Sequence, residues 1–223
     1  DLTELPRSMI VIGGGYIGAE LAQMFARAGV EVTLVFRSHL LPEGEPEIGA
    51  ALAGYLADEG IQVIGGVTYD SVARTDAGIG LTVVQDGRPQ TITAERILVA
   101  TGRAPNTETL GLAEAGVAQT ASGAILVDDR MRTSKAGVYA AGDVTGKDQF
   151  VYMAAYGAKL AAKNALNGDS LRYDNSAMPA VVFTDPQVGS VGFTEARARE
   201  AGHEVRTPVL SLGNLPRPLP ARD

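Results

Sequence analysis

The chain has 223 residues, a hydrophobic fraction of 45%, a net charge of −7 and no cysteine. This composition is typical of an α/β protein that buries a core, and the negative charge argues against nucleic acid or an anionic membrane surface as a partner. The lack of cysteine excludes disulfides and thiolate metal sites, and we predict no metal site. Since no apolar run is long enough to span a bilayer and no signal peptide is evident, we expect a cytoplasmic protein without a membrane partner.

The first part of the chain alternates between two apolar patterns. Short apolar runs at Ser8–Ile12, Glu31–Phe36 and Ile61–Ile64 predict buried parallel strands. Between them, apolar residues at helical spacing predict helices at Tyr16–Ala28 and Glu47–Asp58. The order β-α-β-α-β predicts a Rossmann-like domain with right-handed crossovers.

The pattern then changes before the sheet is resumed. Alternating segments at residues 71–74, 80–85 and 90–93, separated by turn signals, predict an antiparallel meander inserted into the crossover. The apolar run Arg96–Ala100 predicts a further strand of the parallel sheet.

Beyond that strand we expect fewer regular elements. Apolar runs predict strands at Ala124–Val127, Gly137–Ala140 and Ala180–Phe183, and helical periodicity predicts a helix over Phe150–Asn167. No internal repeat is evident, so the chain is a succession of unlike segments.

A glycine loop joins the first strand to the first helix. Gly13, Gly15 and Gly18 satisfy the pattern GxGxxG in the context that gives it meaning, with a strand before and a helix after. Gly13 permits a tight turn, Gly15 lets a pyrophosphate approach the backbone, and Gly18 lets helix and strand pack closely. The helix start then binds the phosphates. The alternative is a purely structural turn, and we favour dinucleotide binding.

The end of the second strand distinguishes NAD from NADP. An acidic residue there would bind the ribose 2′-hydroxyl, whereas arginine suits a 2′-phosphate. The chain has Phe36, Arg37, Ser38 and His39 at this place, with no carboxylate until Glu43. We predict that Arg37 and Ser38 bind the 2′-phosphate of NADPH, with His39 as a further donor. The alternative is that Arg37 is a solvated surface residue.

Three blocks in this order and at these separations resemble the class I pyridine nucleotide-disulfide oxidoreductases, a family that includes glutathione reductase. The blocks are Ile10–Leu21, Val99–Thr107 and Val138–Asp143. The resemblance implies FAD and NADPH as cofactors and a homodimeric parent protein. It also implies that this chain is an internal fragment.

The same resemblance implies a division into three parts. Residues 1–102 would form the NADP-binding Rossmann domain, and residues 103–170 the C-terminal part of an FAD-binding domain. Residues 171–223 would begin an α+β interface domain that makes the dimer.

The family also implies roles for individual residues. Tyr16 resembles the aromatic gate over the flavin. Glu20 resembles the carboxylate that pairs with a lysine beside the flavin, and that lysine would lie upstream of this chain. Asp143 resembles the acceptor for the ribityl chain. Their alternatives are a packed aromatic, a solvated helix residue and a turn aspartate. Together with the motifs, the resemblance gives these cofactor residues: Gly13, Gly15, Tyr16, Ile17, Gly18, Arg37, Ser38, Gly102 and Arg103 for NADPH, and Gly142, Asp143, Phe150 and Val151 for FAD.

Within the family, the later residues are most similar to the mercuric reductase branch. The similar runs are Gln149–Ala155, Ala177–Val188 and Leu212–Arg217. This would imply a parent enzyme that reduces Hg(II) to Hg(0) through a cysteine pair. Because the chain has no cysteine, we expect it to be inactive alone. The alternatives are a dihydrolipoamide dehydrogenase-like or other flavoprotein disulfide reductase, and a non-catalytic NADP-binding regulatory module.

Overall fold

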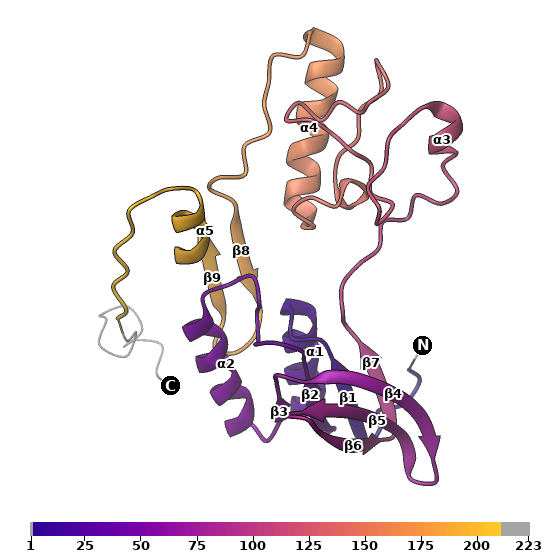
Figure 1. Cartoon of the computed structure of the whole chain (residues 1–223), viewed down its shortest axis with the longest axis vertical. Helices are drawn as coiled ribbons and strands as arrows, with labels where there is room; N and C mark the ends of the chain where they lie inside the picture. Colours follow the sequence, from indigo (N-terminus) through magenta and orange to yellow (C-terminus); the bar gives the residue numbers. More distant parts are fainter. Residues whose placement is uncertain (1, 211–223) are drawn as a thin grey trace.

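A computed structural model describes residues 2–210 of the chain (Figure 1). Its first part is a four-stranded parallel sheet in the order β3-β2-β1-β7. The strands are β1 (Ser8–Ile12), β2 (Glu31–Val35), β3 (Gln62–Ile64) and β7 (Arg96–Val99). The predicted Rossmann-like arrangement is confirmed, and each strand lies within one residue of its expected bounds.

Two helices make the crossovers of this sheet. Helix α1 spans Tyr16–Arg27 and α2 spans Pro46–Asp58. Each ends just before a glycine in the left-handed region, Gly29 at φ +90° and Gly60 at φ +87°, because glycine reverses the chain there without a Cβ penalty. Pro46 occupies the start of α2, where its missing N–H costs nothing.

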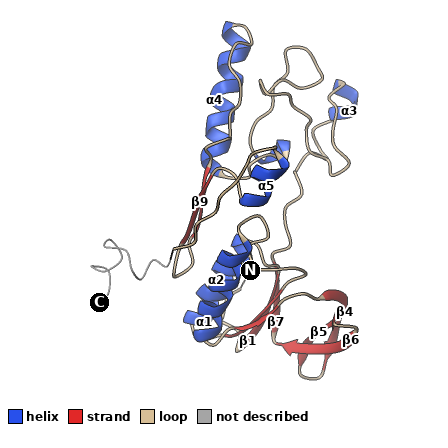
Figure 2. Ribbon diagram, turned by 60° about the vertical axis from the view of Figure 1, so that its left-hand side comes forward, coloured by secondary structure: helices blue, strands red, loops and turns tan. Residues whose placement is uncertain are grey.

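The two faces of the sheet are covered by different elements (Figure 2). Side chains alternate along a strand, so Met9 and Val11 join a buried cluster with α1 and α2, whereas Ile10 and Ile12 join a second cluster on the opposite face. Leu81 and Val83 of the antiparallel meander fill that second cluster. The parallel sheet is thus buried on both sides, as expected for its type.

The predicted meander is also confirmed. Its strands are β4 (Thr68–Thr75), β5 (Gly78–Gln85) and β6 (Arg88–Ala94), paired in that order. The β5–β6 hairpin turns through Asp86 and Gly87, both at positive φ, which is the geometry that matches the twist of two-residue hairpins.

The strands expected at Ala124–Val127 and Gly137–Ala140 are not formed, and this prediction was wrong. Each segment takes part only in an isolated bridge, Gln119 with Ile125 and Arg132 with Tyr139. A strand requires a neighbour that continues the ladder, and neither bridge is continued by a second residue pair. Only the short helix α3 (Leu112–Ala115) and the 3₁₀ turn η1 (Asp143–Thr145) are regular there.

The remaining elements follow at the other end of the chain. Helix α4 (Val151–Asn167) confirms the predicted helix and lies at the end of the molecule opposite the parallel sheet (Figure 1). The strands β8 (Pro179–Val182) and β9 (Val188–Val191) form an antiparallel hairpin, followed by α5 (Glu195–Glu200). The similarity run Leu212–Arg217 lies outside the described residues. Over residues 2–210, no helix combines the length and the apolar character that a bilayer crossing requires.

Candidate functional site

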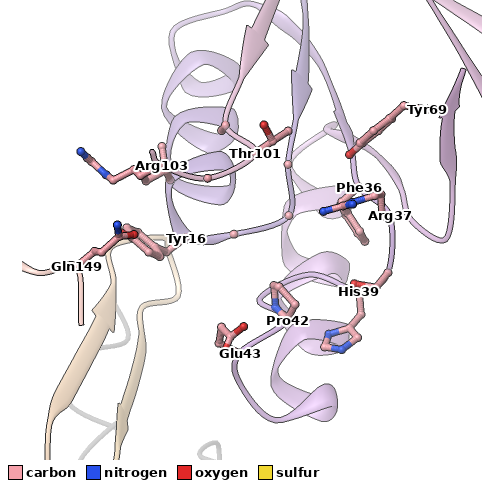
Figure 3. A pocket seen from close by; sticks show the side chains of 17 residues that line it. Tyr16, Phe36, Arg37, His39, Pro42, Glu43, Tyr69, Thr101, Arg103 and Gln149 are labelled. Atoms are coloured by element: carbon pink, nitrogen blue, oxygen red, sulfur yellow. The ribbon is translucent and has the colours of Figure 1, made fainter. Parts of the chain in front are cut away.

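A cavity of about 410 Å³ lies where the carboxyl ends of β1, β2 and β7 meet (Figure 3). From β1 the chain passes through α1 to β2 on one side, whereas β7 lies on the other side of β1. A parallel sheet opens a crevice at such a change of direction, and ligands of this fold bind there. The lining comes mainly from the loops that follow these three strands.

The surroundings of the glycine loop after β1 agree with the steric roles that the sequence predicted for its three glycines. A Cβ on Gly13 would lie 2.2 Å from the Ala100 carbonyl oxygen, and one on Gly18 would lie 1.9 Å from the Gly13 carbonyl oxygen. The loop, α1 and the end of β7 therefore approach more closely than any side chain permits. At Gly15 no other described residue comes within 4 Å of a Cβ position, so the open side of the loop faces the cavity.

The start of α1 points its backbone donors toward this loop. Gly15 is the N-cap, no described side chain caps the helix, and the first turn has no acidic residue. The amides of Tyr16, Ile17 and Gly18 stand in the first turn, where a helix provides no acceptor of its own. Such an end attracts a phosphate through these donors and the helix dipole.

At the end of β2, the side chain at the position where an acidic residue would select NAD is buried. Phe36 is 6% exposed, and Cβ atoms on Gly14 and Gly65 would lie 2.8 and 2.4 Å from its ring. The ring therefore fills the space under the glycine loop. Arg37 and Ser38 follow it, exposed and lining the cavity.

The charges at the end of the cavity beside β2 favour the binding of an anion. Among residues 2–210, Arg37 takes part in no ion pair. Glu43 also lines the cavity, but its carboxylate is 2.5 Å from the guanidinium of Arg197. His39 lines the cavity as well, with Nδ1 3.3 Å from the Leu40 carbonyl oxygen.

The opposite end of the cavity brings together residues from distant parts of the chain. Tyr16 and Gln149 line it there (Figure 3), and the Tyr16 ring stacks on Phe150 with centroids 5.5 Å apart. Phe150 in turn stacks on Tyr152. Val151, also expected at the flavin, is 85% exposed.

Of the predicted flavin residues, Asp143 lines a second, smaller cavity of about 210 Å³ together with Arg103 and Gln149, and Gly142 precedes Asp143 in the chain. An oxygen of Asp143 is 3.8 Å from a guanidinium nitrogen of Arg103. Gly142 adopts φ +83°, and Gly102, in the lining of the larger cavity, adopts φ +126°. Both turns thus use backbone conformations that side chains disfavour.

Glu20 contacts the segment between β8 and β9. Its Oε1 accepts a hydrogen bond from the backbone N–H of Phe183 at 2.9 Å. The structure thus joins Glu20 to the β8–β9 hairpin and leaves its role toward a flavin a prediction.

A polar network that sequence reasoning missed fixes the same hairpin on α1. The Gln23 amide, 4% exposed, accepts from the Asp185 backbone N–H at 2.7 Å and donates to the Asp185 carbonyl oxygen at 2.8 Å. Arg27 donates to both Glu59 and Asp185. The hydrogen bond from Arg27 holds the pKa of the Glu59 carboxyl below its usual range. No local pattern signals these contacts, since Gln23 and Arg27 lie about 160 positions from Asp185, and Arg27 lies 32 positions from Glu59.

Tyr69 and Thr101 line the cavity and were also missed. Tyr69 belongs to β4, and its sequence context marks it only as a strand residue. Its burial raises the pKa of the phenol. Thr101 belongs to the sharp break after β7 that the sequence did show.

Comparison with known families accounts for nearly the whole chain. Residues 1–162 match the family model described as pyridine nucleotide-disulphide oxidoreductase. Residues 178–223 match the dimerisation domain of the same family.

Curated relatives give a more specific likeness. The chain is 44% identical to a mercuric reductase from Staphylococcus aureus, over 98% of this chain and 40% of that protein. It is 45% identical to one from Acidithiobacillus ferrooxidans over 96% and 38%, and 43% identical to one from Streptomyces lividans over 100% and 47%. The chain thus spans less than half the length of these relatives.

Solved structures show the same fold. The HOCl-induced flavoprotein disulfide reductase RclA from Escherichia coli matches with a TM-score of 0.83 and 32% identity, covering 100% of this chain and 51% of that one. LpdA from Mycobacterium tuberculosis matches with a TM-score of 0.85 and 32% identity, covering 99% and 48%.

Proposed function

The chain belongs to the pyridine nucleotide-disulphide oxidoreductase family, and from that premise we propose that it supplies the NADPH site of a flavin-dependent mercuric reductase. The observation that supports Hg(II) as the substrate is the match of 96–100% of the chain to curated mercuric reductases at 39–45% identity. We propose the domain division 1–102, 103–170 and 171–223, and a homodimeric parent. The match to the dimerisation domain supports the latter.

In this proposal the cavity binds NADPH with its pyrophosphate at the glycine loop. Gly15 leaves the backbone open to the phosphates, and the first-turn amides of α1 donate to them. Arg37 and Ser38 hold the 2′-phosphate, because a guanidinium binds a phosphate through two parallel hydrogen bonds. A buried Phe36 at the end of β2 supports NADPH over NADH, because no carboxylate stands there to bind a 2′-hydroxyl or to repel the 2′-phosphate.

The other end of the cavity takes the nicotinamide. Tyr16, held on Phe150 by stacking, is the gate that moves aside when the nicotinamide enters. Glu20 stands one turn further along α1, and we assign it the role of the carboxylate beside the flavin. Gly102 and Arg103 line the cavity where β7 ends.

We assign Gly142, Asp143, Phe150 and Val151 to the flavin. The residues present fit such a group. A cavity lies beside Asp143, Gly142 adopts a turn that side chains disfavour, and no described side chain caps the start of α4. A flavin held by these residues would supply the redox chemistry that links the nicotinamide to the acceptor. The chain contributes the binding of both groups and their orientation.

The acceptor chemistry lies outside this chain. Soft Hg(II) prefers thiolate ligands, and the chain has no cysteine, so the thiols that hold the metal belong to the rest of the parent protein. We expect the 223-residue chain alone to reduce neither Hg(II) nor a disulfide.

A second candidate is a parent enzyme that reduces a disulfide. The likeness to RclA, a flavoprotein disulfide reductase by its name, favours it at 32% identity. The two candidates share every residue of the NADPH site and differ in the acceptor.

The test uses the flavin-loaded, full-length parent protein. It receives NADPH and Hg(II) with excess thiol, and volatile mercury is collected. The proposal expects mercury vapour that depends on NADPH. NADPH oxidation with a disulfide acceptor, without any vapour from Hg(II), would replace the proposal with the second candidate.

A further inference from the structure

Tyr69 stands apart from the other residues that line the larger cavity. Among the described lining residues, it is the one that comes from the meander. The others come from the loops after β1, β2 and β7, from the first turn of α1, or are Gln149. Figure 3 shows its side chain beside the loop that carries Phe36 and Arg37. An aromatic wall at this place has no counterpart in the roles proposed so far.

The ring is fixed relative to the glycine loop. The Tyr69 hydroxyl donates to the Val35 carbonyl oxygen at 3.2 Å, and the same oxygen accepts from the Gly13 backbone N–H at 2.8 Å. The ring also packs against the buried cluster on this face of the sheet. Two independent contacts thus hold it in one position without a ligand.

The backbone of β4 is adapted to this position. The pairing of β4 with β5 changes register between Tyr69 and Ser71. Such a bulge bends the strand and changes the direction of the side chains beside it. Here it sits immediately after the residue that turns toward the cavity.

The order of groups along the cavity indicates what the ring would contact. In Figure 3 the glycine loop lies between Tyr16 and Gln149 at one end and Tyr69 and Arg37 at the other. The pyrophosphate of NADPH joins two nucleosides, and the 2′-phosphate belongs to the adenosine. A pyrophosphate at the glycine loop and a 2′-phosphate on Arg37 therefore direct the adenine toward Tyr69.

We propose that Tyr69 is the platform on which the adenine of NADPH packs, and that Tyr69, Arg37 and Ser38 together form a subsite for adenosine 2′-phosphate. This inference rests on the proposed NADPH site. The large apolar face of a tyrosine packs well on a flat base, and stacking of this kind contributes strongly to binding because every base presents a π-face. The fixed ring adds no ordering cost when the ligand binds.

Calorimetry on the flavin-loaded, full-length protein tests the subsite with two halves of the cofactor, adenosine 2′,5′-bisphosphate and nicotinamide mononucleotide. Tyr69→Leu is expected to bind the bisphosphate about tenfold more weakly, because the flat ring is lost. Tyr69→Phe keeps the ring and is expected to bind within about threefold of the unmodified protein, since only one neutral hydrogen bond is lost. Both variants should bind the mononucleotide unchanged.

Three results would overturn the inference. If Tyr69→Leu bound the bisphosphate as tightly as the unmodified protein does, the adenine platform would be excluded and the proposed NADPH site would stand. An equal loss with both probes would indicate a general structural effect. No bisphosphate binding by the unmodified protein would remove the proposed NADPH site together with the inference.

Because Tyr69 packs on the core, Tyr69→Leu could fail to fold. A measurement on the unmodified protein therefore tests the contact independently of that variant. In protein deuterated except at tyrosine, saturation of the tyrosine ring protons should attenuate the adenine H2 and H8 signals of the bisphosphate. The Tyr69→Phe protein should lose this effect. No attenuation in the unmodified protein would contradict the contact directly.

Discussion

The part of the chain with the parallel sheet and the meander and the segment that follows it share similar apolar patterns but differ in structure. Residues 8–99 form ladders in two sheets with two buried clusters. Residues 103–150 contain comparable apolar runs, yet these form isolated bridges. The difference teaches that alternation and β-branched residues mark a segment as able to pair, whereas a ladder also needs a partner strand of matching register.

The two candidate cavities differ in the same way, because paired strands support the larger one and turns surround the smaller one. The larger one is lined by the ends of strands that pair within this chain. The smaller one lies among turns and has a single ion-pair contact, between Arg103 and Asp143. The proposed nucleotide site therefore depends on contacts that this chain makes internally, and substitutions there have definite expected outcomes.

The largest effect should come from the close approach at Gly18. Gly18→Ala places a Cβ on the Gly13 carbonyl, where 1.9 Å is available, and should destabilise the nucleotide-binding part by about 3 kcal/mol. Gly54→Ala is the matched control, because Gly54 lies exposed within α2 with no described atom near its Cβ position. It should stabilise by about 0.5–1 kcal/mol. Thermal unfolding of both variants measures this. Equal unfolding midpoints for Gly18→Ala and Gly54→Ala would contradict the proposed steric role of Gly18.

The next effect concerns cofactor choice. Arg37→Glu should weaken NADPH binding about 100-fold, since a charged hydrogen-bond donor is lost and a repulsive carboxylate is added. NADH binding should stay constant or improve. Arg88→Glu makes the same change of charge on the meander, away from the cavity lining, and should leave both unchanged. Binding titrations decide, and an NADPH affinity that survives Arg37→Glu would count against the 2′-phosphate contact.

A smaller effect is expected where the β8–β9 hairpin joins α1. Gln23→Ala leaves the N–H and carbonyl of Asp185 without their partner and should cost about 1–3 kcal/mol. Hydrogen exchange in residues 179–191 should accelerate. Gln90→Ala removes an exposed amide from the meander and serves as control. Unchanged exchange after Gln23→Ala would show that apolar packing alone holds the hairpin.

The smallest effect is a dependence of stability on pH. The hydrogen bond from Arg27 lowers the pKa of Glu59 in the folded state. A carboxyl with a lowered folded pKa stabilises above its unfolded pKa, and this contribution is lost as pH falls through the folded value. The unfolding midpoint should therefore fall on acidification below about pH 4.3, and less steeply in Glu59→Gln. Identical slopes would contradict this role of the pair.

The sequence predicted the elements whose signals are local. The glycine loop, the strand before it and the helix after it were identified because Gly13, Gly15 and Gly18 have fixed steric roles. The end of β2 was located, and Arg37 does line the cavity.

What could not be predicted depends on distant contacts. Tyr69 reaches the cavity through the register of the meander, and Gln23 meets Asp185 only when the hairpin folds back on α1. Neither residue differs locally from an ordinary strand or helix residue. The expected strand at Ala124–Val127 failed for the converse reason, because its pattern was local and its partner was not available.

The most direct test of the central claim compares the two nicotinamide cofactors in the flavin-loaded parent protein with Hg(II) as acceptor. The account predicts that kcat/KM for NADPH exceeds that for NADH by about tenfold or more, because Arg37 and Ser38 bind only the phosphorylated ribose. Equal values of kcat/KM for NADPH and NADH in the unmodified protein would contradict it.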